Sequence, residues 1–514
     1  MYSNKKQVNI LTSLLVAYGV KHAVVCPGSR NSPIVHNLSE CPDITCYPVT
    51  DERSAGFYAL GMALCEAEPV AVCVTSGTAL LNLAPAVAEA YYQHVPLVVI
   101  SADRPAQWID QQDGQTLPQT DALGRFVRKA VTLPEIAGDN DEQHWYCNRL
   151  VCEALMVRHA PVHINVPISE PLFDYDTAVL SEERKIELLP ADIPAATLSH
   201  VCRMFMQSQR PMLIAGQPMN ALMDEAVMLI GDDERYVPDF VLYIGGSIVS
   251  KRLKRFLRKA KETWVVNWDG EVTDTFMNVT HVIQGDGEVV ADQVRFFMQQ
   301  QPHPFVQLWD DLLTQLRQKT DAYQPAYSEM AVVRCFEESL PQDAYVHYAN
   351  SSAIRLANIY ARHHVYCNRG VNGIEGSLST AAGFSLVYPD KVFCVIGDLS
   401  FFYDQNALWN QNLQGNLRIL LLNNGRGGIF NMLPGLEASP ARDRFVAASH
   451  HTSAEGICMQ NDIVYLKAEN MEQIQQGIDA LLLMESDRPV LLEVFTNAAD
   501  DVRTLKDYYK SLIC

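Results

Sequence analysis

The sequence lacks the long apolar runs and the short motifs that define several large protein classes. No apolar run approaches the roughly 18 residues that a membrane-spanning helix requires. The first twenty residues are too polar for a secretory signal peptide and contain no small-residue cleavage site, so we expect none. There is also no C-x-x-C pair, Walker loop, G-x-S-x-G or H-E-x-x-H motif. The sequence therefore favours neither a membrane protein nor a zinc, dithiol, P-loop or serine-hydrolase site.

Positive charge is scarce as well. The chain has 40 basic and 60 acidic side chains, for a net charge of −20. The electric field of such a negatively charged protein repels nucleic acids and anionic membranes, so we expect neither as a partner. The 13 cysteines are odd in number and scattered, and several fall inside apolar runs, as buried free thiols do. A reducing cytoplasm is the expected location.

Short apolar runs rich in β-branched residues recur along the chain, each followed by a loop and an amphipathic stretch. The clearest cover residues 71–76, 97–101, 162–167, 211–216, 241–246, 264–268, 344–348, 392–397, 418–424 and 489–495. Strands without polar alternation are buried on both faces, which predicts parallel sheets covered by helices. The expected fold class is therefore α/β, with doubly wound parallel-sheet domains.

A chain of 514 residues is too long for one hydrophobic core. Proline-containing, charge-rich stretches near 174–194 and 299–325 have the composition of linkers. They predict three domains, which cover residues 1–180, 190–320 and 326–514. The central domain is short, because residues 231–240 leave no room for a complete βα unit. This indicates either a deletion or a flexible segment missing from the sequence.

A candidate metal site follows two predicted strands in the last domain. Asp398 comes directly after one of these strands and Asn424 ends the other, one βαβ crossover apart. Since the carboxyl ends of parallel strands meet at the ligand-binding edge of a sheet, both side chains should lie there. A carboxylate and an amide oxygen suit a hard divalent cation that also holds phosphate oxygens. The glycine-rich turn 425–428 can offer a backbone carbonyl. The alternative is ordinary turn hydrogen bonding at two strand ends.

The G-D-x-S and N-N pattern of these strand ends resembles the diphosphate-binding motif of thiamine-diphosphate enzymes. The resemblance implies a pyrimidine-binding, a central and a diphosphate-binding domain. It also implies Mg²⁺ or Mn²⁺ held by Asp398, Asn424 and the carbonyl of Arg426. The usual third glycine of the motif is Leu399 here, which agrees with one subfamily. The other implied cofactor contacts are Thr78, Ile374, Glu375, Gly397, Leu399, Ser400, Gly427 and Ile429, with Ile374 supporting a bent cofactor.

In the first domain, the acidic stretch 50–53 (TDER) follows a short strand and opens a helical segment. A lone cluster of this kind is commonly a solvated or helix-capping group. The resemblance implies instead that Glu52 is catalytic, because a carboxyl held against the aminopyrimidine ring activates the cofactor. The two ends of the cofactor are gripped by different domains, usually of different subunits. A homodimer or homotetramer with active sites at the subunit interface is therefore implied.

Further stretches are more specific. Residues 26–33 (CPGSRNSP), 103–105 (DRP), 368–376 (NRGVNGIEG) and 427–430 (GGIF) resemble the 2-succinyl-5-enolpyruvyl-6-hydroxy-3-cyclohexene-1-carboxylate synthases of menaquinone biosynthesis, in the expected order along nearly the whole chain. The resemblance implies a transferase that decarboxylates 2-oxoglutarate and adds the product to isochorismate in a Stetter-like 1,4-addition. The implied substrate contacts are Ser29, Arg30, Arg104, Gln115, Lys251, Arg252, Ser351, Arg355, Arg369, Phe430 and Leu433.

The basic residues of this set make chemical sense independently. Two dicarboxylates that enter an acidic protein need concentrated cations, and guanidinium groups bind carboxylates bidentately. Individual alternatives remain: Lys251 and Arg252 fall in a run that also fits a solvated basic helix face, and Phe430 also fits a core role. For the whole chain, the alternatives are another thiamine-diphosphate 2-oxo-acid decarboxylase or acetohydroxyacid synthase, and a non-catalytic binding protein of the same fold.

Overall fold

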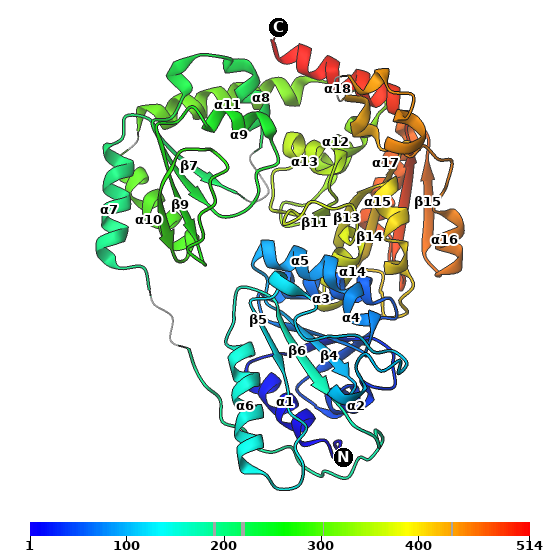
Figure 1. The fold of residues 1–514 in the computed structure, drawn as a ribbon. Helices are drawn as coiled ribbons and strands as arrows, with labels where there is room; N and C mark the ends of the chain where they lie inside the picture. Colours follow the sequence, from blue (N-terminus) through cyan, green and yellow to red (C-terminus); the bar gives the residue numbers. More distant parts are fainter. Residues whose placement is uncertain (189–191, 217–220, 302, 433–434, 514) are drawn as a thin grey trace.

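The computed structural model describes residues 1–188, 192–216, 221–301, 303–432 and 435–513. They form three parallel β-sheets, each with helices on both faces, arranged as three lobes (Figure 1). In Figure 1 the N-terminal lobe is at the bottom, the central lobe at the upper left and the C-terminal lobe at the upper right. The predicted α/β fold class is confirmed. One sheet falls inside each of the three predicted domains, whose boundaries stay a prediction.

The N-terminal sheet has six parallel strands in the order β2-β1-β3-β4-β6-β5. Their bounds are β1 (His22–Val25), β2 (Thr45–Pro48), β3 (Val70–Val74), β4 (Leu97–Asp103), β5 (Lys129–Thr132) and β6 (Val162–Pro167). One face is covered by α1 (Lys6–Ala17), α2 (Ser32–Glu40) and α6 (Asp141–Leu155). The other is covered by α3 (Glu52–Glu66), α4 (Thr78–Asn82) and α5 (Ala84–Gln93). The apolar strands β3 and β4 are buried along their whole length, as expected for central strands of a covered sheet.

The C-terminal sheet repeats this strand order as β12-β11-β13-β14-β16-β15. Its strands are β11 (Tyr345–Tyr348), β12 (Val365–Tyr366), β13 (Val392–Gly397), β14 (Leu417–Asn423), β15 (Val464–Ala468) and β16 (Val490–Phe495). Helices α12 (Glu329–Ser339), α13 (Ser352–Tyr360), α17 (Met471–Leu483) and α18 (Ala498–Ile513) cover one face. Helices α14 (Ser377–Val387), α15 (Asp398–Tyr403) and α16 (Glu455–Gln460) cover the other. Both six-stranded sheets thus present an equivalent carboxyl edge, where such sheets bind ligands.

The central sheet has four described strands in the order β10-β9-β8-β7. They are β7 (Pro211–Ala215), β8 (Phe240–Ile244), β9 (Glu262–Asn267) and β10 (Val279–Gln284). Helices α8 (Met223–Ile230), α9 (Lys251–Leu257) and α11 (Pro304–Ala322) cover one face, and α7 (Ala195–Gln207) and α10 (Gly287–Gln300) cover the other. Between α8 and β8 there is only the 3₁₀ turn η3 (Glu234–Tyr236), so this segment contains no complete βα unit.

The lobes are joined through shared hydrophobic cores. The α8–α9–α11 face of the central sheet is continuous with the core under α12, α13 and α18. The α3–α5 face of the N-terminal sheet is continuous with the core under α14. None of the helices in the described ranges is long and apolar enough to cross a membrane.

Helices α3 and α14 approach each other at glycines. A Cβ atom on Gly61 of α3 would lie 1.9 Å from the carbonyl oxygen of Thr380, and one on Gly383 of α14 would lie 2.1 Å from the carbonyl oxygen of Tyr58. No real Cβ atom fits at such distances. The two helix backbones therefore touch directly, which only glycine permits.

This contact generates a stability prediction. Replacing Gly61 with alanine should lower the free energy of unfolding by about 1–3 kcal/mol, because the helices must separate to admit the methyl group. Thermal unfolding measures the effect. The matched control is Gly456→Ala in α16, where nothing lies within 4 Å of an added Cβ, and this variant should be neutral or slightly more stable. Equal unfolding temperatures for the two variants would contradict the packing argument.

Candidate active site

The two predicted metal ligands follow neighbouring strands of the C-terminal sheet. Strands β13 and β14 are paired, so Asp398 and Asn424 lie at the same carboxyl edge. Asp398 is 4% exposed, and its Oδ1 accepts a hydrogen bond from the backbone N–H of Leu399 at 2.6 Å. Its Oδ2 accepts from the N–H groups of Gly425 and Arg426, at 2.8 and 3.1 Å. The carboxylate thereby orders the turn that carries the other predicted ligands.

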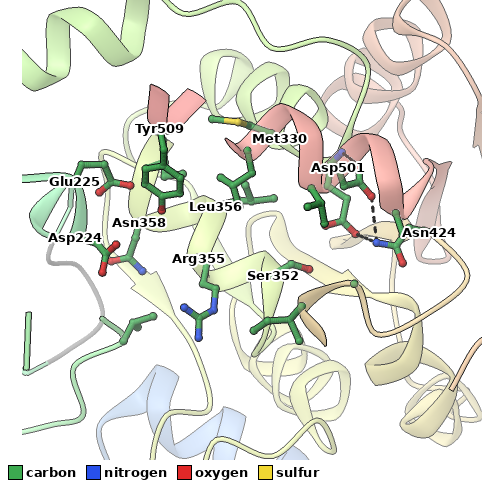
Figure 2. A pocket seen from close by; sticks show the side chains of 18 of the residues that line it. Asp224, Glu225, Met330, Ser352, Arg355, Leu356, Asn358, Asn424, Asp501 and Tyr509 are labelled. Carbon is green, nitrogen blue, oxygen red and sulfur yellow. Dashed lines mark hydrogen bonds between the residues drawn. The ribbon is translucent and has the colours of Figure 1, made fainter. Parts of the chain in front are cut away.

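The side chain of Asn424 is held by two further carboxylates (Figure 2). Its Nδ2 donates to Oε1 of Glu329 at 3.0 Å and to Oδ2 of Asp501 at 3.2 Å. The backbone N–H of Glu329 donates to Oδ1 of Asp501 at 2.8 Å. The Oδ1 atom of Asn424 is buried and has no hydrogen-bond partner. Sequence reasoning missed both carboxylates because they lie 95 and 77 positions from Asn424 along the chain.

Negative charge accumulates at this edge. Burial raises the pKa of Asp398 and the pKa of Asp501 above their usual range. Burial also raises the pKa of Glu329 well above its usual range, and the charges of Asp501 and Asp398 raise it further. His450, in the loop before α16, places its Nε2 atom 3.4 Å from Oδ2 of Asp398.

These features fit a divalent cation. An unpartnered buried amide oxygen is a ready ligand, and a cation would favour the ionised form of carboxylates whose pKa burial has raised. In the part of the chain that the structure describes, no cluster of three or more histidine, cysteine, aspartate or glutamate side chains has metal-site geometry. The predicted set needs no such cluster, because it combines one carboxylate with an amide oxygen and a backbone carbonyl.

A cavity of about 150 Å³ opens beside Asn424, between the central and C-terminal lobes. Of the predicted residues, Arg355, Asn424 and Ile429 line it, and Figure 2 shows the Arg355 side chain from α13 next to the central lobe. Ser352 also lines the cavity. Ser351 is the N-cap of α13, with a positive φ of 79°, and is not among the lining residues.

Several cations converge near this cavity. Arg369 donates from Nη1 to Oδ1 of Asn350 at 2.9 Å, and burial together with the charge of Arg355 lowers the pKa of Arg369. On α9, burial and the charges of Arg369 and Lys251 lower the pKa of the half-buried Lys254. Lys254 on α9 is therefore a neighbour of Arg369 in the C-terminal lobe. Lys254 belongs to this group although sequence analysis did not select it.

The two predicted contacts on α9 differ in their surroundings. Lys251 is exposed, whereas Arg252 forms an ion pair with Asp224 and is 44% exposed. Leu253 and Phe256 are buried on the opposite side of the helix. The helix is thus amphipathic, and a solvated basic face accounts for part of its charge.

In the N-terminal lobe, Glu52 is the first residue of α3. The preceding Asp51 is the N-cap, and its Oδ1 accepts from the backbone N–H of Arg53 at 2.9 Å. Because Asp51 caps the helix, the carboxylate of Glu52 is left for another role. Its Oε2 accepts from Nδ2 of Asn82 at 3.1 Å. Thr78 begins α4, at the carboxyl edge of the N-terminal sheet, and is exposed.

Two predicted arginines lie at this edge as well. Arg30 is 5% exposed and donates to the carbonyl oxygen of Ile168 at 2.9 Å. Burial, and after it the charge of Arg104, lower the pKa of Arg30, so the two guanidinium groups are neighbours. Arg104 lies 3.4 Å from Asp113. Ser29 and Gln115 are exposed.

The remaining predicted residues all belong to the C-terminal lobe. Ile374 and Glu375 precede α14, and Ile374 is 41% exposed. The others lie at the β13–α15 junction or in the turn after β14: Gly397, Leu399, Ser400, Gly427, Ile429 and Phe430. Leu433 lies outside the described residues. Within the described ranges, Glu52 makes no hydrogen bond or ion pair with Asp398 or Asn424.

Comparisons with known proteins agree with this arrangement. Residues 6–123 match the model "Thiamine pyrophosphate enzyme, N-terminal TPP binding domain", and residues 349–494 match the corresponding C-terminal model. Relatives named 2-succinyl-5-enolpyruvyl-6-hydroxy-3-cyclohexene-1-carboxylate synthase occur in Bacteroides fragilis (44% identical, all of both chains), Bacteroides thetaiotaomicron (43%, all of both chains) and Flavobacterium johnsoniae (33%, 96% of this chain and 97% of the relative).

Fold, site and matched models define a thiamine-diphosphate-dependent enzyme. Its full-length relatives are more specific. The chain belongs to the family of 2-succinyl-5-enolpyruvyl-6-hydroxy-3-cyclohexene-1-carboxylate synthases. The alignment with the B. fragilis relative spans 560 positions against 514 residues here, so this chain lacks counterparts of some tens of that protein's residues.

The cavity also generates a pH prediction. Glu225 of α8 lines it and is 2% exposed, and burial raises its pKa from 4.5 to about 7. Between these values the unfolded chain releases a proton that the folded protein retains, so stability falls as the pH rises through that window. The Glu225→Gln variant has no such loss. The difference between its unfolding temperature and that of wild type should therefore shift in favour of the variant as the pH rises from 5 to 8.

Thermal unfolding at several pH values tests this prediction. The control is Glu182→Gln at an exposed position, whose difference from wild type should stay flat over the same range. A flat difference for Glu225→Gln would mean that burial does not hold a proton on this carboxyl.

Proposed function

We propose that this protein decarboxylates 2-oxoglutarate and adds the resulting four-carbon unit to isochorismate in a Stetter-like 1,4-addition. The product would be 2-succinyl-5-enolpyruvyl-6-hydroxy-3-cyclohexene-1-carboxylate, made in the cytoplasm for menaquinone biosynthesis. The observation that carries the proposal is the pairing of the Asp398–Asn424 edge with arginine groups on both half-sites. The family's printed name supports the same product.

The cofactor would be held at its two ends by different lobes. Asp398, Asn424 and the carbonyl of Arg426 would bind Mg²⁺ or Mn²⁺ and, through it, the diphosphate. Glu52 would hold a proton against the pyrimidine ring, next to Thr78. Thiamine diphosphate, when bound, supplies the electron sink for the carbanion that decarboxylation creates. The remaining contacts would come from Ile374, Glu375, Gly397, Leu399, Ser400, Gly427 and Ile429.

The basic side chains would bind the substrate carboxylates. Arg30 and Arg104 form one pair of neighbouring cations, and Arg355 and Arg369 form another. Two pairs match the two dicarboxylates, since each guanidinium can donate two hydrogen bonds to one carboxylate. A decarboxylase or acetohydroxyacid synthase with an apolar acceptor has no use for so many cations. Ser29, Gln115, Lys251, Arg252 and Ser351 would add polar contacts, with Phe430 and Leu433 as an apolar wall.

The assembly would be a homodimer or homotetramer, with each active site shared between subunits. Three exposed positions support this: Ile374, Thr78 and Ser29 are predicted contacts that remain open in the single chain. The domains would be a pyrimidine-binding domain over residues 1–180, a central domain over 190–320 and a diphosphate-binding domain over 326–514.

The reaction is tested by mass spectrometry of the products. Wild-type protein with thiamine diphosphate, Mg²⁺, 2-oxoglutarate and isochorismate should form an adduct that carries the four-carbon unit. Glu52→Gln should lose this product by about 100-fold or more, because a general acid–base group contributes on that scale. Decarboxylation without an adduct would refute isochorismate as acceptor, and the absence of any turnover would refute the reaction.

The shared site is tested by subunit complementation. Glu52→Gln and Asp398→Asn should each be inactive alone. If every site combines Glu52 of one subunit with Asp398 of another, mixed dimers of the two variants contain one intact site. Co-expression with two different affinity tags should then restore about a quarter of wild-type activity in a random mixture of dimers. No recovery in the doubly tagged dimer would place both residues of each site in one chain.

A further inference from the structure

We propose that Glu329 and Asp501 are positioning residues that fix the orientation of the Asn424 amide, so that its oxygen faces the cation. The inference deepens the proposed function and rests on its assignment of Asn424 as a metal ligand. No part of the resemblance discussed above selects either carboxylate. The geometry around Asn424 carries the proposal.

The two carboxylates come from the starts of two helices that cover the same face of the C-terminal sheet. Glu329 is the first residue of α12 and is 6% exposed, and Asp501 is in the first turn of α18. They are fixed to each other by the bond from the Glu329 N–H to Oδ1 of Asp501, at 2.8 Å. The Thr496 hydroxyl donates to Oδ2 of Asp501 at 3.0 Å. Both acceptors are thus in place before any ligand binds.

An asparagine amide has two chemically different ends, and these acceptors select one of them. Ionised carboxylates only accept hydrogen bonds, so Glu329 and Asp501 in their charged form can be faced only by the Nδ2 end of Asn424. A half-turn of the amide would bring its oxygen against two carboxylates and its N–H groups toward the cation. With the orientation fixed, Oδ1 points away from Glu329 and Asp501, which together form a carboxylate clamp on the amide (Figure 2). Its burial without a partner is costly unless a ligand occupies the space beside it.

The preceding asparagine shows the contrast. Asn423 also donates from Nδ2 to a buried carboxylate, Oε1 of Glu493, at 2.7 Å. Its Oδ1, however, accepts from the N–H of Gly425 at 3.1 Å, so both ends of this amide are satisfied within the protein. Of the two adjacent asparagines, only Asn424 keeps a free amide oxygen. A neighbouring carboxylate therefore does not by itself make an asparagine a candidate metal ligand. The amide oxygen without a partner distinguishes Asn424 from Asn423.

The test is a titration of the full-length protein with Mn²⁺, followed by electron paramagnetic resonance in the presence of thiamine diphosphate. Glu329→Ala removes one acceptor and should weaken Mn²⁺ binding by about 10- to 100-fold. It should also change the zero-field splitting of the bound ion. Glu329→Gln keeps an acceptor oxygen and should bind Mn²⁺ nearly as wild type does. Asp501→Ala is the second variant, with the same expected loss, should Glu329→Ala not fold.

The matched control is Glu493→Ala, which removes the carboxylate that accepts from Nδ2 of Asn423. It should lower the unfolding temperature but leave Mn²⁺ binding unchanged. Wild-type Mn²⁺ affinity in a folded Glu329→Ala or Asp501→Ala protein would overturn the clamp while leaving the metal assignment intact. If wild type itself shows no Mn²⁺ binding that depends on thiamine diphosphate, the metal assignment fails and the clamp falls with it.

Discussion

The direct contact of the α3 and α14 backbones is the constraint on which the rest of the molecule depends. Helix α3 begins at Glu52, and α14 begins directly after the loop that carries Arg369 and Ile374. Because these helices meet at Gly61 and Gly383, the helix layers that cover the facing sides of the two six-stranded sheets pack directly on each other in one core. Each helix thus leads back to a carboxyl edge. The residues proposed for the active site are thus positioned by a packing contact that lies outside them.

The strands that are buried on both faces could be predicted from the sequence. All ten apolar runs selected from the sequence became strands, including β13 and β14 at the metal edge. Six described strands lie outside those runs. Five of them, β2, β5, β10, β12 and β15, are at sheet edges, and the sixth, β1, has only 4 residues. Edge strands are partly exposed, so their sequences lack the continuous apolar signal.

The candidate site divides along similar lines. Residues at strand ends, such as Asp398, Asn424 and Arg104, could be selected from the sequence. An apolar run predicts a buried strand, and the end of the run gives the position of the turn that follows. Glu329 and Asp501 could not, because they lie at the starts of two helices that reach Asn424 only when these pack on the C-terminal sheet. Lys254 could not, because it comes from α9 of the central lobe. Ion pairs such as Arg252–Asp224 are likewise set by tertiary contacts. Local pattern predicts which residues reach the edge; long-range packing decides what surrounds them.

The short connection between α8 and β8 has a consequence for engineering. Residues 231–240 enter β8 at its amino end, whereas the cavity residues Val249 and Ser250 follow its carboxyl end. A parallel strand separates the two by its whole length, so changes at one end need not reach the other. The residues of η3 are not among those that line the cavity. The η3 turn is therefore a suitable place to graft a reporter domain or a surface tag into a working enzyme.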